Sequence, residues 1–289
     1  MNIPSVTIKQ LLEAGVHLGH KTFRWNPKMK KYIFGSKNSI HIIDLTQTLE
    51  LINVSLVEIH KCISSGGKIL FVSTKKQAAE TIVKLASDTS QYYVSHRWLG
   101  GMLTNWKTIS NSIKRLKKLT ADLKKENTGF TKKENLKMGI QRDKLERSLG
   151  GIAEMKKVPE MIFIIDINLE SIAVQEAKKL NIPIVAIVDT NTDPTNINFP
   201  IPGNDDARRA INLYSDLVRE TILDAQKNIV IKKEEEVPEN KAKVEKTKVA
   251  DDTKKIETKA KDKKKVEKEE KKPKSIFSKI KSLAQKKIK

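Results

Sequence analysis

Two short runs of almost wholly apolar residues, Met161 to Ile165 and Pro183 to Val188, constrain the fold of this chain more than any other feature. Each run is too short to favour a helix and is typical of a strand covered on both faces. The segment between them, Leu169 to Leu180, has helical spacing and follows Asn168, which can cap a helix. Strand, helix and strand in this order predict parallel crossovers and therefore an α/β sheet.

The same alternation is present in the first hundred residues. The pattern predicts short strands at Ile40 to Ile43, Lys68 to Val72 and Tyr92 to Ser95. It predicts helices at Ile8 to Ala14 with Gly15 as a left-handed cap, at Asp44 to about Ser64, and from the hydroxyls of Ser73 and Thr74 to Ala86, with a last helix at Ala207 to Gln226. Together with the strands and helix of residues 161–188, these elements predict one α/β domain.

A long basic segment with heptad-like spacing interrupts this domain. Between Thr108 and Lys124 the apolar residues recur every three or four positions with lysines between them, as in a coiled coil. A break at Asn127 to Gly129 is followed by Thr131 and Glu134, which have the spacing of a capping box that starts a return helix toward Pro159. The segment therefore predicts an antiparallel coiled-coil hairpin that serves as an interaction arm.

Composition separates the last residues from the rest. Residues 227–289 contain 23 lysines and 12 acidic residues, and this Lys/Glu-rich composition predicts a disordered tail. Only Ser275 to Ile288 has the spacing of an amphipathic helix, which could lie on RNA, a protein groove or an anionic membrane. We expect residues 1–106 and 159–226 to form the two parts of the α/β domain, residues 107–158 the hairpin and residues 227–289 the tail.

The formal net charge of +21 indicates a polyanionic partner, because a protein gains affinity from each counterion that it displaces. Nucleic acid is the leading class. An anionic membrane is the alternative, although no apolar run approaches the ~20 residues that span a bilayer. The N-terminus lacks the features of a signal peptide, so we expect a cytoplasmic protein. The single cysteine, Cys62, is most simply a small core residue.

Two stretches combine cations with aromatic rings, which suits a nucleic-acid surface. One is a loop expected from His17 to Tyr32, and the other runs from Ser95 to Lys107 around the pair Gly100 and Gly101. The alternative for both is that the rings pack in the core, which we favour for the tryptophans of the second stretch. Lys75 and Lys76 oppose the dipole at a helix N-terminus, so we expect them to serve an anionic partner.

Enzymatic and metal sites are weaker hypotheses. His17, His20 and Asp189 could form a zinc site, but the spacing supplies only two ligands. Asp166, Asp189 and Asp193 could hold a metal in an α/β enzyme, yet no nucleophile or base accompanies them, and turn and capping chemistry explains these carboxylates better. We therefore predict neither an enzyme nor a metal or other cofactor.

Several segments together resemble the bacterial family of the second protein of the small ribosomal subunit, ribosomal protein S-two. They are collinear over roughly residues 5–226. The matching runs are Gly15 to His20, Trp25 to Met29, Tyr32 to Phe34, Ile40 to Leu45, Thr74 to Ala78, Arg97 to Gly101, Leu103 to Trp106, Asp189 to Asn191 and Ile201 to Ala207. The charged tail lies outside the resemblance.

The resemblance implies a flavodoxin-like α/β domain with a protruding coiled-coil hairpin. It also implies a structural protein that is a monomer within the ribosome, binds ribosomal RNA between the head and body of the small subunit, and helps to dock the large messenger-binding protein. We expect RNA contacts at the basic residues of the stretches described above: Lys21, Arg24, Lys28, Lys30, Lys31, Lys75, Lys76, Arg97, Lys107, Lys114 and Arg115.

Overall fold

The computed structural model describes residues 4–124 and 131–228. The chain divides into two units, Met1–Val230 and Ile231–Lys289, and the described residues all lie in the first. The predicted break at Asn127 to Gly129 lies outside the described residues. So do residues 229–289 of the predicted tail, including the terminal amphipathic segment.

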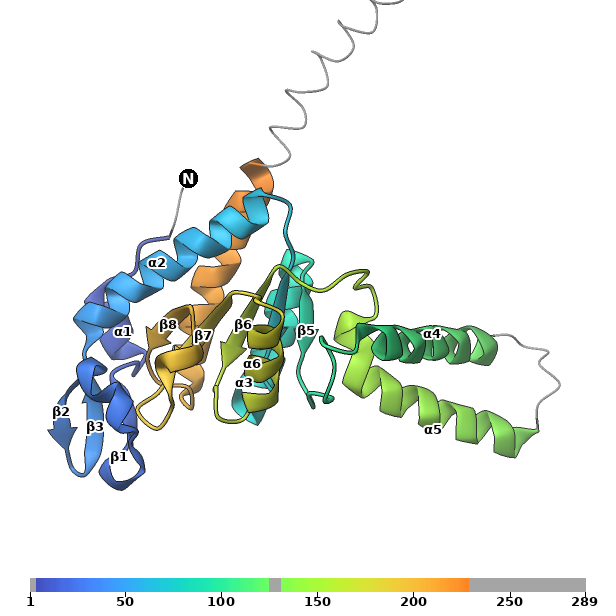
Figure 1. Cartoon of the computed structure of the whole chain (residues 1–289), viewed down its shortest axis with the longest axis horizontal. Coiled ribbons are helices and arrows are strands. Elements are labelled where there is room, and N and C mark those ends of the chain that lie inside the picture. Colours follow the sequence, from blue (N-terminus) through green and yellow to red (C-terminus); the bar gives the residue numbers. More distant parts are fainter. Residues whose placement is uncertain (1–3, 125–130, 229–289) are drawn as a thin grey trace, which may run out of the picture. The chain divides into compact units, whose positions relative to one another are not determined.

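A five-stranded parallel sheet forms the centre of the first unit (Figure 1). Its strands are β4 (Ile69–Val72), β5 (Tyr92–Val94), β6 (Met161–Ile165), β7 (Ile184–Val188) and β8 (Phe199–Pro202). Their order across the sheet is β5-β4-β6-β7-β8. Counted along the chain this is 2-1-3-4-5, the order typical of flavodoxin-like sheets. The predicted parallel sheet flanked by helices is therefore confirmed.

Both faces of the sheet are covered. Along β4, the side chains of Ile69 and Phe71 enter one hydrophobic core, and those of Leu70 and Val72 enter the other. The first core includes α1 (Ile8–Glu13), α2 (Leu45–Ser64), α3 (Lys76–Thr89) and the helix of residues 208–228. The second includes α6 (Ser171–Lys179) and the residues at the base of two further helices described below. Burial on both faces explains the continuous apolar runs.

Some helix ends have the caps that the sequence predicts, and others do not. Asp44 caps α2 by accepting a hydrogen bond from the Thr46 N–H at 3.0 Å, and Gly15 closes α1 with φ +76°. The prediction of a hydroxyl cap for α3 is wrong, because the N-cap residue is Lys75 and no side chain caps that end. Asn168 does not cap α6 either, since this helix begins at Ser171 with Glu170 as its N-cap residue.

A second, antiparallel sheet contains β1 (Leu18–Lys21), β2 (Ile33–Lys37) and β3 (Ile40–Ile43), in the order β1-β3-β2. Two short 3₁₀ helices, η1 (Thr22–Arg24) and η2 (Pro27–Tyr32), connect β1 to β2. Of these three strands, the sequence predicted only β3. The loop expected at residues 17–32 is wrong for β1 and for the two 3₁₀ helices. Asn38 and Ser39 both have positive φ and form the tight turn between β2 and β3.

The basic segment forms α4 (Trp106–Leu123) and α5 (Lys132–Leu149), which lie side by side (Figure 1). Thr131 and Glu134 form the predicted capping box at the start of α5. The return helix ends at Leu149, well before Pro159, and a 3₁₀ turn, η3 (Gly150–Ile152), follows it. Coiled-coil packing of the two helices stays a prediction. Within the described residues, no helix has the length and apolar character needed to cross a membrane.

Candidate nucleic-acid interface

The small antiparallel sheet is fastened to the loops that follow the parallel strands. The backbone N–H groups of His20 and Asn26 donate to the Thr190 hydroxyl at 2.9 Å and to its carbonyl at 2.8 Å. Lys28 Nζ lies 2.6 Å from a carboxylate oxygen of Asp193. Thr190 and Asp193 follow β7, so these bonds hold the basic segment of residues 21–31 at the carboxyl edge of the parallel sheet.

Other predicted cations follow neighbouring strands at this same edge. Lys76 begins α3 after β4, and Arg97 follows β5. We call these residues, together with the cations of residues 21–31, the carboxyl-edge surface. Its exposed basic residues are Lys21, Arg24, Lys28, Lys30, Lys31, Lys76 and Arg97. Because the strands are parallel, positions far apart in the sequence supply charge to one edge.

Aromatic rings accompany these cations. Phe23 and Phe34 are 73% and 79% exposed, and the Arg24 guanidinium lies 5.5 Å from the centre of the Phe23 ring. Trp25 is partly exposed and packs against His41 with ring centres 5.5 Å apart. Tyr32 is buried, so the ring that the sequence placed in this surface belongs to the core. The exposed rings and cations have the composition of a surface that stacks bases and binds phosphates.

Lys75 differs from the other predicted contacts. Its side chain is only 11% exposed, and its Nζ lies 3.2 Å from Asp166, 3.0 Å from Asp205 and 2.7 Å from Asp206. The three carboxylates raise its pKa despite the opposing effect of burial. The lysine therefore holds an internal acidic cluster together, and its charge is not available to a bound phosphate. We leave Lys75 out of the RNA contacts proposed below.

The remaining predicted cations lie on α4. Lys107, Lys114 and Arg115 are all exposed, and the apolar stripe of Ile109, Ile113 and Leu116 is buried against the second core. Arg115 also donates to the Gln141 side chain of α5 at 3.2 Å. The helix thus presents its charges outward on the face opposite the buried stripe.

One buried carboxylate organises the junction between the sheet and α4. Glu176 of α6 accepts hydrogen bonds from the indole N–H of Trp98 and from the backbone N–H groups of Gly101, Leu103 and Thr104, at 2.7–3.1 Å. Burial alone would raise the pKa of Glu176, but these bonds hold it below the ordinary value. Trp98 is buried and Gly101 has φ +83°, so both are structural, as expected.

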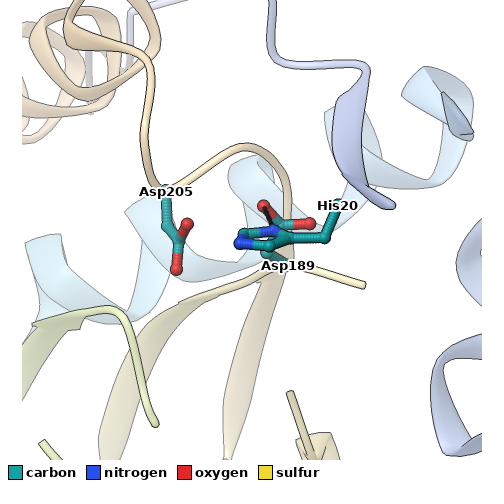
Figure 2. A group of neighbouring side chains, drawn as sticks. All are labelled: His20, Asp189 and Asp205. Carbon is teal, nitrogen blue, oxygen red and sulfur yellow. Dashed lines mark hydrogen bonds and ion pairs between the residues drawn. The ribbon is translucent and has the colours of Figure 1, made fainter. Parts of the chain in front are cut away.

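The predicted histidine site has a different composition from the one expected. His20, but not His17, lies in a possible metal-binding group, and its partners are Asp189 and Asp205, with ligand atoms within 4.8 Å of one another (Figure 2). His20 Nδ1 lies 2.9 Å from Asp189, and this hydrogen bond raises the pKa of the imidazole. Asp205 was not predicted for this group, since its sequence position suggested only a turn before the last helix.

The carboxylates of the enzyme hypothesis do not form a catalytic group. Asp166 has φ +69° and accepts hydrogen bonds from the backbone N–H groups of Asn168 and Leu169, which is turn chemistry. Asp193 is paired with Lys28 and caps the turn at Thr195. Asp189 binds His20 and its neighbour Thr190. The structure thus gives the three aspartates separate structural partners.

Comparison with known proteins identifies the family. The family model described as ribosomal protein S2 matches residues 11–225. Proteins described as small ribosomal subunit protein uS2 are 57% identical in Sinorhizobium medicae and 59% identical in Bartonella henselae, each over 224 residues. These matches cover 78% of this chain and 88% and 87% of the two relatives. The chain therefore belongs to the ribosomal protein S2 family, whose members are structural and non-enzymatic.

Proposed function

We propose that this protein is a structural constituent of the small ribosomal subunit that supports translation by binding ribosomal RNA in the cytoplasm. The observation that carries the proposal is the exposure, along one edge of the sheet and on one helix, of every predicted cation except Lys75. Lysine and arginine at such a surface bind phosphate oxygens, and folded RNA is recognised largely through its shape and backbone. Family membership supports ribosomal RNA as the particular RNA.

Two surfaces of the protein make the proposed contact with RNA. The carboxyl-edge surface contacts phosphates, with Phe23 and Phe34 available to stack on exposed bases. Lys107, Lys114 and Arg115 of α4 form the second contact, and α4 and α5 pack as a coiled-coil hairpin that carries it away from the sheet. By analogy with its family, the protein acts as a monomer within the ribosome, lies at the junction of head and body, and helps to dock the large messenger-binding protein.

Matched charge variants of the full-length chain test the RNA contact. Lys21, Arg24 and Lys30 have no ion pair with another described residue, so replacing them by Gln removes three exposed charges without breaking a salt bridge. The control replaces Lys84, Lys156 and Lys179, which precede β5, β6 and β7 and therefore lie toward the opposite, amino edge, and which also have no ion pair with another described residue. Both variants lose the same formal charge and keep the tail.

We expect the carboxyl-edge variant to co-sediment poorly with small subunits and the control to resemble wild type. The slope of log affinity against log salt should fall by about 0.7–0.9 for each lost phosphate contact. Equal weakening of both variants would show that net charge or the tail drives binding, and the proposed surface would then be wrong. Folding of each variant is checked by circular dichroism.

A further inference from the structure

A cavity lies where α5 ends and the chain returns to the parallel sheet. It has a volume of about 440 Å³ and is bordered by β5, by the loop that follows β5 and by the last turns of α5. Tyr93 and His96 line it from the first side, and Glu146 and Arg147 line it from α5. Small-molecule sites commonly measure about 300–1,000 Å³, so this cavity is large enough to take a nucleobase.

Two adjacent glycines form one wall of this cavity. A Cβ at Gly151 would lie 2.2 Å from the Tyr93 backbone oxygen and 2.7 Å from a carbon of the Tyr93 ring, so η3 packs directly on β5. The Glu146 side chain folds back against the preceding glycine, since its Oε1 would lie 3.1 Å from a Cβ at Gly150. The tyrosine ring and the Glu146 carboxylate therefore lie beside the same pair of glycines.

Three polar side chains of the cavity are available to a ligand. His96, Glu146 and Arg147 are exposed, and their side chains make no hydrogen bond or ion pair with another residue of the described ranges. Asp143, the other acidic residue of the cavity, is instead paired with Arg142. The unpaired donors and acceptors are thus one carboxylate, one guanidinium and one imidazole.

The carboxylate of Glu146 indicates which ligand fits. It repels phosphate, so it does not serve the RNA backbone. A carboxylate can accept two N–H bonds side by side. Among the four bases of RNA only guanine presents two adjacent N–H donors on its Watson–Crick edge, N1–H and the N2 amino group. Its O6 and N7 are acceptors to which arginine donates, and unpaired bases stack on tyrosine and histidine rings.

We propose that this cavity binds one unpaired guanine of the bound RNA. Glu146 accepts from N1–H and the N2 amino group, Arg147 donates to O6 or N7, and the rings of Tyr93 and His96 provide the stacking surface. The inference rests on the proposed RNA contact, because the cavity adjoins the carboxyl-edge surface at Arg97, the residue after His96. Arg97 is exposed and can bind the phosphate attached to that guanosine.

The test measures nucleotide preference by equilibrium dialysis of the full-length chain against guanosine monophosphate. We expect one saturable site, with adenosine, cytidine and uridine monophosphates bound about 10-fold more weakly or worse. Inosine monophosphate, which lacks only the N2 amino group of guanosine, should bind about 5-fold more weakly or worse, because Glu146 then has one donor. General attraction of phosphate to the basic tail affects all these nucleotides alike. Equal affinity for all of them, or no saturable binding, would overturn the proposal.

Two matched variants locate the site. Glu146→Gln should lose the preference for guanosine over adenosine monophosphate, since an amide oxygen accepts these donors less well than a carboxylate. Glu154→Gln is the control, because Glu154 is an exposed acid just after η3 that does not line the cavity, and it should keep the wild-type preference. The same preference in both variants would contradict the site.

Co-sedimentation of the same proteins with small subunits separates this inference from the proposed function. If the exposed cations at positions 21, 24 and 30 are needed for co-sedimentation but wild type shows no preference for guanosine monophosphate, only the guanine site is wrong. If wild type prefers guanosine monophosphate but those cations are not needed, the guanine site stands and the proposed RNA surface is wrong.

Discussion

At the scale of single residues, one buried carboxylate fixes the conformation of a distant loop. Glu176 accepts hydrogen bonds from a loop that lies more than seventy residues earlier in the chain. Each of these donors would otherwise be buried without a partner, which costs more than an ordinary hydrogen bond contributes. The residue thus fixes the path of the chain from β5 into α4.

Replacing this carboxylate tests that role. Glu176→Gln should lower the free energy of unfolding at pH 7 by about 2–3 kcal/mol, because a neutral amide accepts fewer bonds and brings two donors of its own. Urea unfolding followed by tryptophan fluorescence measures the change, with Trp98 as a nearby reporter. Glu80→Gln, an exposed position on α3, is the control and should change stability by less than about 0.5 kcal/mol.

The stability difference between wild type and Glu176→Gln should depend on pH. The pKa of Glu176 is lower in the folded protein than in the unfolded chain, so its stabilising contribution is fully present above the unfolded value of about 4.3. It is lost as the pH falls through the folded value. The difference in unfolding free energy between wild type and Glu176→Gln should therefore shrink on acidification below about pH 4. If this difference stays constant with pH, the carboxyl group of Glu176 does not stabilise the fold through its negative charge.

Residue identity alone could not reveal such partnerships. Lys75 and Lys76 are neighbours with the same side chain, yet the first is mostly enclosed and paired with aspartates and the second is exposed. The aspartates that distinguish them lie about 90 and 130 positions later, where only the fold brings them close. The exposed cations of residues 21–31 were easier to predict, because a dense local pattern indicates them without tertiary information.

At the scale of elements, the sequence is most informative where one local pattern dominates. Met161–Ile165 is a strand with the predicted bounds, since a run of five apolar residues is too short to favour a helix and is typical of a strand covered on both faces. The strand β8 contains Pro200 and Pro202 and was not predicted, because proline cannot donate to a central ladder. It is tolerated here since β8 lies at the edge of the sheet. The short, partly exposed β1 gives no period from which to predict it.

Two glycines of the return segment test how closely it packs on the sheet. A Cβ at Gly151 would lie 2.2 Å from the backbone oxygen of Tyr93 in β5, whereas one at Gly139 within α5 would meet nothing within 4 Å. Gly151→Ala should destabilise the protein by about 1–3 kcal/mol through overpacking. Gly139→Ala should stabilise it by up to about 1 kcal/mol, because alanine favours the helix. Thermal unfolding of both variants distinguishes these outcomes, and equal shifts would contradict the packing.

At the scale of the described unit, exposed cations from distant sequence positions gather at one edge of a conventional α/β frame. The parallel strands direct their following loops to one edge, and the antiparallel sheet adds a basic loop there through Asn26 and Lys28. Composition indicated a polyanionic partner. That positions 21–31, 76 and 97 lie at one edge could be recognised only from the order of the strands. We propose that this carboxyl edge, together with α4, is the side of the protein that contacts RNA.

The most direct test compares lysine reactivity in the free protein and in assembled small subunits. Amine-reactive labelling read by mass spectrometry reports each exposed lysine separately. We predict that Lys21, Lys30, Lys76 and Lys114 become protected on assembly, while Lys84, Lys156 and Lys179 at the amino edge keep their reactivity. Protection of the amino-edge lysines with the carboxyl-edge lysines still reactive would contradict this placement of the RNA.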